Sequence, residues 1–88
     1  MNRTEFEQKA IADGYQEPVE VTHPAEMSRE PHSHGFDARL LVLGGELRIG
    51  IDGNSRRYLP GEVCQVGAGT MHSEQTGRAG VRLLVARR

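Results

Sequence analysis

Residues 61–76, GEVCQVGAGTMHSEQT, decide how this chain is expected to fold. Residues 62–66 have the length and composition of a short β-strand. Residues 67–69 follow as a turn, because two of the three are glycines, which adopt backbone conformations that other residues avoid. A further strand pattern over residues 70–75 carries His72. The stretch therefore predicts two short strands joined by a glycine turn, with an imidazole in the second strand.

The rest of the chain after Gly14 has the same character. Asp52-Gly53 is a strong signal for a two-residue hairpin, and Pro60-Gly61 marks another turn. We expect strands at residues 18–23, 38–43, 46–51, 56–59, 62–66, 70–75 and 81–86, separated by glycines that include Gly44–Gly45, Gly77 and Gly80. Many short strands with no helix between them predict an all-β sandwich or barrel.

The first residues predict one short helix over residues 4–13. Thr4 and Glu7 have the spacing of a capping box, and Gly14 is a suitable C-cap. The apolar face is narrow and consists of Phe6, Ala10 and Ile11. We therefore expect residues 1–17 to be a helical segment over one mouth or edge of a barrel formed by residues 18–88.

Composition limits the kinds of partner. The 88 residues suffice for one domain, and 11 basic against 12 acidic residues give no electrostatic reason to expect binding to nucleic acid or to an anionic membrane. The lone Cys64 cannot form an internal disulfide, so we expect a small core residue in a reducing compartment. No apolar run has the length of a signal peptide core or a membrane span, and the expected location is the cytoplasm.

Three of the four histidines form a candidate metal site. His32 and His34 are two residues apart, so on a strand both imidazoles face the same side. Together with His72, they can cap one face of a metal ion and leave the opposite face open. A histidine pair alone is also common by chance on protein surfaces, and His23 is expected to be an exposed loop residue of this ordinary kind.

The ordered set of turns and histidines resembles the cupin superfamily. In the second cupin motif, the positions of the glycine, proline, glycine, histidine and asparagine are taken here by Gly61, Gly67, Gly69, His72 and Thr76. In the first motif, the two histidines and the closing glycine are His32, His34 and Gly45. The resemblance covers about residues 19–86 and implies a small double-sheet jelly-roll barrel with a short N-terminal helix.

The same resemblance implies what the protein binds and where it departs from the family. Ala38 stands at the position of the family's metal-binding glutamate, and Glu26 stands where the first motif opens with glycine. The implied cofactor is a divalent metal, with iron expected and zinc, nickel, copper or manganese as alternatives. The implied partner is a small molecule in the barrel mouth. The leading hypothesis is a mononuclear metal-binding protein, and a non-haem dioxygenase is the reaction class considered if it is an enzyme, which the sequence leaves open. The alternatives are a non-catalytic sensor and a metal-free structural barrel.

Two further expectations concern a fourth ligand and the oligomeric state. Glu74 is favoured over Asp37 as a ligand, or as an acceptor that orients an imidazole, because strand alternation turns Glu74 to the same side as His72. A bulge near Gly35 would reverse this. We also expect a homodimer through the apolar strands 81–85 and 18–22, because a small barrel has exposed edges. Arg39 and Tyr58 suit a pocket mouth or a structural role equally well.

Overall fold

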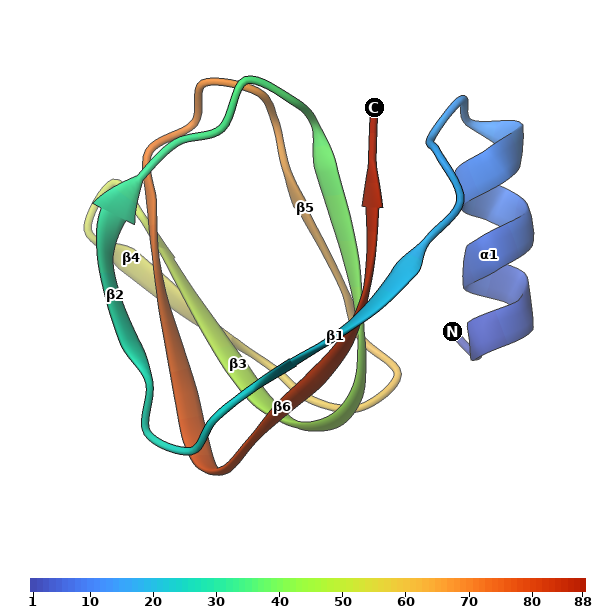
Figure 1. Ribbon diagram of the computed structural model, residues 1–88. Helices are drawn as coiled ribbons and strands as arrows, with labels where there is room; N and C mark the ends of the chain where they lie inside the picture. Colours follow the sequence, from blue (N-terminus) through green and yellow to red (C-terminus); the bar gives the residue numbers. More distant parts are fainter.

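The computed structural model describes all 88 residues as one short helix and six strands (Figure 1). The elements are α1 (Arg3–Ala12), β1 (Val19–His23), β2 (Ser28–His32), β3 (Ala38–Ile51), β4 (Asn54–Tyr58), β5 (Val63–Val66) and β6 (His72–Arg87). Every strand pair is antiparallel. The single helix has ten residues, and it is not long and apolar enough to cross a membrane.

Two long strands divide the sheet into two halves. In one half, β6 (residues 81–87) lies between β1 and β3 (residues 38–42), and β5 pairs with the outer side of β3. In the other half, residues 72–76 of β6 lie between β2 and residues 47–50 of β3, and β4 follows. Figure 1 shows β3 and β6 bending together where the halves meet. This is the all-β, double-sheet architecture that the sequence predicts.

Glycines bend β3 and β6 where the sequence analysis expected them to end. Gly45 and Gly80 have φ of 78° and 70°, in the region that glycine enters freely. A Cβ on Gly45 would collide with the carbonyl oxygen of Gly80, and one on Gly80 would collide with that of His23. Each strand therefore continues through a sharp bend. The prediction of two separate strands in place of β3, and of two more in place of β6, was wrong. At Asp52-Gly53 the predicted hairpin turn is confirmed, with positive φ at both residues.

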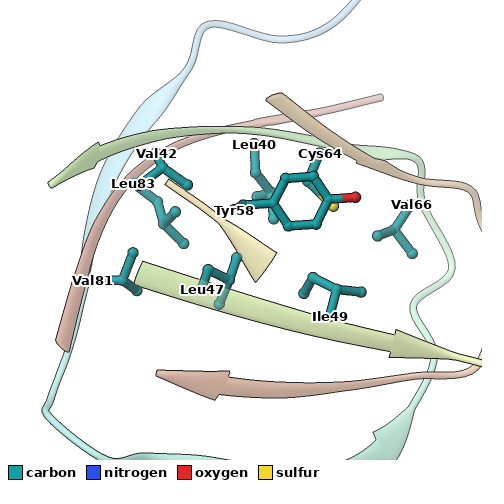
Figure 2. Packing of buried hydrophobic residues seen from close by; sticks show 9 residues of the cluster. All are labelled: Leu40, Val42, Leu47, Ile49, Tyr58, Cys64, Val66, Val81 and Leu83. Atoms are coloured by element: carbon teal, nitrogen blue, oxygen red, sulfur yellow. The ribbon is translucent and has the colours of Figure 1, made fainter. Parts of the chain in front are cut away.

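The main core fills the space between the two halves of the sheet. It is made of inward-facing apolar side chains from four strands (Figure 2): Leu40, Val42, Leu47, Ile49, Tyr58, Cys64, Val66, Val81 and Leu83. Cys64 is only 2% exposed, as expected of a small core residue. Burial raises the pKa of its thiol, so the reactive thiolate is disfavoured.

The N-terminal helix packs on the outer face of the sheet. Asn2 caps it by accepting a hydrogen bond from the backbone N–H of Glu5, whose side chain accepts one from Asn2 in return. The expected Thr4–Glu7 box is therefore wrong by two residues. A second core forms beneath the helix: Phe6, Ala10, Tyr15, Leu41, Leu84 and Ala86. The helix thus covers outward-facing residues of β3 and β6 rather than a mouth or an edge, while Ile11 stays exposed.

The position of β6 changes the expected dimer surface. Residues 81–85 of β6 pair with β1 on one side and with β3 on the other, and Leu83 and Leu84 are fully buried within the chain. This segment cannot contribute an apolar interface, contrary to the prediction. Strand β1 does lie at the edge of the sheet, and its Val19 is 63% exposed.

Candidate metal centre

The three histidines of the two motifs meet at one end of the space between the half-sheets. His32 ends β2 and His72 begins β6, and the two are register partners across that pair of strands. The ring centroid of His34 lies 5.1 Å from that of His32 and 4.9 Å from that of His72. One ligand nitrogen from each ring lies within 4.8 Å of the others. The structure therefore brings together the three residues that the sequence pointed to.

Backbone carbonyls hold two of the three imidazoles. The Nδ1 atom of His32 lies 2.9 Å from the carbonyl oxygen of Glu30, and Nδ1 of His72 lies 2.9 Å from that of Thr70. An imidazole that donates its Nδ1–H to a carbonyl is held in the tautomer whose Nε2 carries a free lone pair. Both rings consequently present Nε2 as a metal donor.

His34 is placed by a loop rather than by a strand, which corrects the expectation that both His32 and His34 lie in one strand. Strand β2 ends at His32, and the carbonyl oxygen of His34 accepts a hydrogen bond of 2.8 Å from the backbone N–H of Gly69. The ring of His34 stacks on Phe36, with centroids 4.7 Å apart and planes 12° apart. The glycine turn of the second motif thus fixes the position of a histidine from the first.

The surroundings of His34 favour its neutral form. Its pKa lies below the ordinary value, chiefly because partial burial penalises the charged ring and secondarily because His72 and His32 would repel it when protonated. A neutral imidazole is the form that coordinates a metal. The electrostatics of the cluster therefore agree with a ligand role.

Asp37 supports this loop and does not face the histidines. One of its carboxylate oxygens accepts a hydrogen bond of 2.9 Å from the backbone N–H of Ala68, and the other accepts one of 3.1 Å from Arg88. These two bonds, with that to Ala68 the larger, lower the pKa of Asp37. The residue ties the loop to the glycine turn and to the C-terminus. The neighbouring Ala38, at the family's glutamate position, is buried and offers no ligand.

Glu74 lies beside the histidines, on the side that strand alternation predicts. Its Oε2 atom is 3.5 Å from Nε2 of His32 and 3.9 Å from the guanidinium of Arg29, and the side chain is only 12% exposed. Because Nδ1 of His32 already faces a carbonyl, a carboxylate near the Nε2 lone pair needs a cation between them or a proton on the ring. The arrangement suits a carboxylate that contacts a bound metal or orients His32.

A cavity of about 130 Å³ adjoins this cluster. Fourteen residues from both halves of the sheet line it: Val21, His23, Arg29, His34, Phe36, Ala38, Leu40, Ile49, Val66, His72, Glu74, Leu83, Val85 and Arg87. His23 was expected to be an exposed loop residue, but it ends β1, is half-buried and faces this cavity. The alternation of Val19, Val21 and His23 along the strand is the sequence signal that would have placed it there. Arg39 and Tyr58, by contrast, are structural, since Arg39 binds Asp13 at 2.7 Å and Tyr58 lies in the core.

The donor set fits a divalent transition metal. Three imidazoles suit zinc, copper, iron or nickel, and Nε2 is the free atom on at least two of them. The ligand nitrogens lie within 4.8 Å of one another, and one ion between them would bind nitrogen at about 2.0–2.1 Å. Three protein ligands would leave a fourth coordination position of such a metal open for water or substrate.

Known structures resemble this chain, although its sequence matches no protein-family model and no curated protein. A protein of unknown function from Rhizobium leguminosarum bv. viciae 3841 superimposes with a TM-score of 0.75 at 18% identity over 81% of this chain and 67% of its own. A cupin superfamily protein from Desulfitobacterium hafniense gives a TM-score of 0.66 at 20% identity over 80% of this chain and 63% of its own.

A third similar structure is the DMSP lyase DddQ from Ruegeria pomeroyi, with a TM-score of 0.72 at 26% identity over 82% of this chain and 37% of its own. The chain thus spans between about a third and two thirds of the length of these three structures. Further matching structures are also named as cupins, in agreement with the bent, all-β sheet seen here. This chain has the cupin fold.

Proposed function

We propose that this protein binds one divalent metal through His32, His34 and His72 and acts on a small organic molecule held in the adjoining cavity. The observation that carries the proposal is the convergence of three imidazoles, two with Nδ1 engaged by backbone carbonyls, beside a cavity that His34 and His72 line. Pre-oriented Nε2 donors with an open side are typical of catalytic rather than closed structural metal sites.

In this proposal the histidines, Glu74 and the apolar residues of the cavity have different roles. The histidines hold the metal, and Glu74 either completes the ligand set or fixes the ring of His32. Leu40, Val66 and Leu83 form an apolar wall that excludes water from the ligand. Iron is the expected metal, and when bound it supplies oxygen activation, in which both atoms of one O₂ enter one molecule of substrate.

Oxygen uptake by iron-loaded protein tests the enzymatic part of the proposal. We expect consumption of O₂ with at least one member of a panel of small diketones, phenols and thiols. His34→Ala is expected to abolish it, because that variant removes a ligand from a loop without disturbing a strand. Nickel-loaded protein serves as the matched control, because it keeps a divalent metal in the site but lacks the iron to which oxygen activation is assigned. Binding of panel members without O₂ consumption would show a binding protein in place of an oxygenase.

A further inference from the structure

Two arginines line the cavity beside the histidines, and they come from opposite halves of the sheet. Arg29 lies in β2, where it is the register partner of Glu74, and Arg87 lies at the end of β6 opposite Ala38. The other four residues of β6 that line the cavity are His72, Glu74, Leu83 and Val85. The cavity therefore has a charged rim over an apolar floor.

Arg87 has no acceptor within the chain. Its guanidinium makes no ion pair and no hydrogen bond, and it lies 5.0 Å from the ring of Phe36. Phe36 in turn stacks on His34. The column of guanidinium, phenyl ring and imidazole positions the arginine relative to a candidate metal ligand, while its N–H donors remain free for another partner.

The cavity wall carries an excess of positive charge. Glu74 lies 3.9 Å from Arg29, and the cavity lining as a whole contains one carboxylate and two guanidinium groups. A divalent metal on three neutral imidazoles adds two further positive charges, and no other carboxylate lines the cavity. A bound anion would offset this charge, and a carboxylate matches the planar fork of arginine with two parallel hydrogen bonds.

We infer that the cavity takes a small organic carboxylate, with its charged group on Arg87, Arg29 beside it, and its reacting end toward the three histidines. The assignment of the reacting end rests on the proposed metal site, whereas the contact with Arg87 does not. A cavity of about 130 Å³ is close to the size of about 150 Å³ that holds one benzene molecule. The ligand is therefore a short-chain acid whose few carbons lie against Leu40, Val66, Leu83 and Val85.

Calorimetric titration of nickel-loaded protein with propanoate and with propanamide tests this inference. The two probes have the same shape and differ in charge, and nickel avoids turnover in air. We expect propanoate to bind at least about tenfold more tightly than propanamide, and Arg87→Gln to remove this preference, since a hydrogen bond to a charged group contributes about one tenfold step or more. Arg87→Lys keeps the charge without the fork and is expected to retain part of the preference.

Arg82→Gln is the matched control. Arg82 lies on the same strand but on the opposite face, is exposed and does not line the cavity. It should leave the preference unchanged, and metal content should be the same in all the variants. Equal binding of propanoate by wild type and Arg87→Gln would overturn the inference. If the wild type holds no metal, the proposed metal-dependent function is wrong, but the inference about Arg87 is still testable. In that case the same titration of metal-free protein is expected to show a preference for propanoate that Arg87→Gln removes.

Discussion

Replacing Gly45 with alanine tests whether the bend in β3 requires glycine at this position. Gly45 has a φ of 78°, and a Cβ there would collide with the carbonyl oxygen of Gly80 on the neighbouring strand. The unfavourable backbone conformation costs about 1–3 kcal/mol, and backbone shifts forced by the added methyl group cost a further 1–3 kcal/mol or so. The free energy of unfolding of an 88-residue chain is only about 4–13 kcal/mol, so Gly45→Ala removes much of it.

Urea unfolding followed by circular dichroism measures this loss. A decrease of about 2 kcal/mol already lowers the unfolding midpoint by about 1 M. Gly44→Ala is the control, because Gly44 lacks a positive φ and a Cβ there would meet no atom within 4 Å. We expect that control to change stability by no more than about 0.5 kcal/mol. Equal effects of the two substitutions would refute the argument that close strand approach at Gly45 requires glycine.

Four further predictions concern the metal site, the stability of the metal-free protein and the assembly. Glu74→Gln should weaken metal binding about 10–100-fold, whereas Glu46→Gln, at a carboxylate paired with Arg48, should not, as measured by competition with a chromogenic chelator. Metal binding should fall steeply from pH 8 to pH 5, because protons compete with the metal for imidazole nitrogens and a free imidazole side chain has a pKa near 6.5; a flat profile would point to other ligands. Since the pKa of His34 is lowered on folding, metal-free protein should also lose stability as the pH falls below about 6.5. Light scattering should give twice the chain mass of 9.7 kDa, through the edge strand β1, and a monomer at micromolar concentration would contradict the expected homodimer.

Turn chemistry predicted the all-β class, and the histidines together with the resemblance to the cupin motifs predicted the cluster. Asp52-Gly53 and the glycines at 67 and 69 act locally, so their effect is readable from the sequence. The bends at Gly45 and Gly80 depend on contact between two strands that are far apart along the chain. A pattern within one strand cannot distinguish such a bend from a strand end, which is why β3 and β6 were each divided.

The residues that line the cavity were likewise predictable where they depend on one strand and not where they depend on the pairing of distant strands. Alternation along β6 placed Glu74 correctly beside His72, because both lie in one regular strand. His23 and Arg29 reach the cavity only because β1 and β2 flank opposite ends of β6, a pairing that the sequence does not specify. The helix was misplaced for a similar reason, since its partners Leu41 and Leu84 become an outer apolar face only when the sheet is formed.

Elemental analysis of the purified protein tests the central claim most directly. The three-histidine site predicts about one divalent metal per chain in the wild type and in His23→Ala, whose ring lines the cavity outside the cluster. It predicts almost none in His72→Ala or His34→Ala, with circular dichroism showing that each variant is folded. Undiminished metal in either of the last two variants, or no metal in wild-type protein supplied with iron, zinc or nickel, would contradict the account.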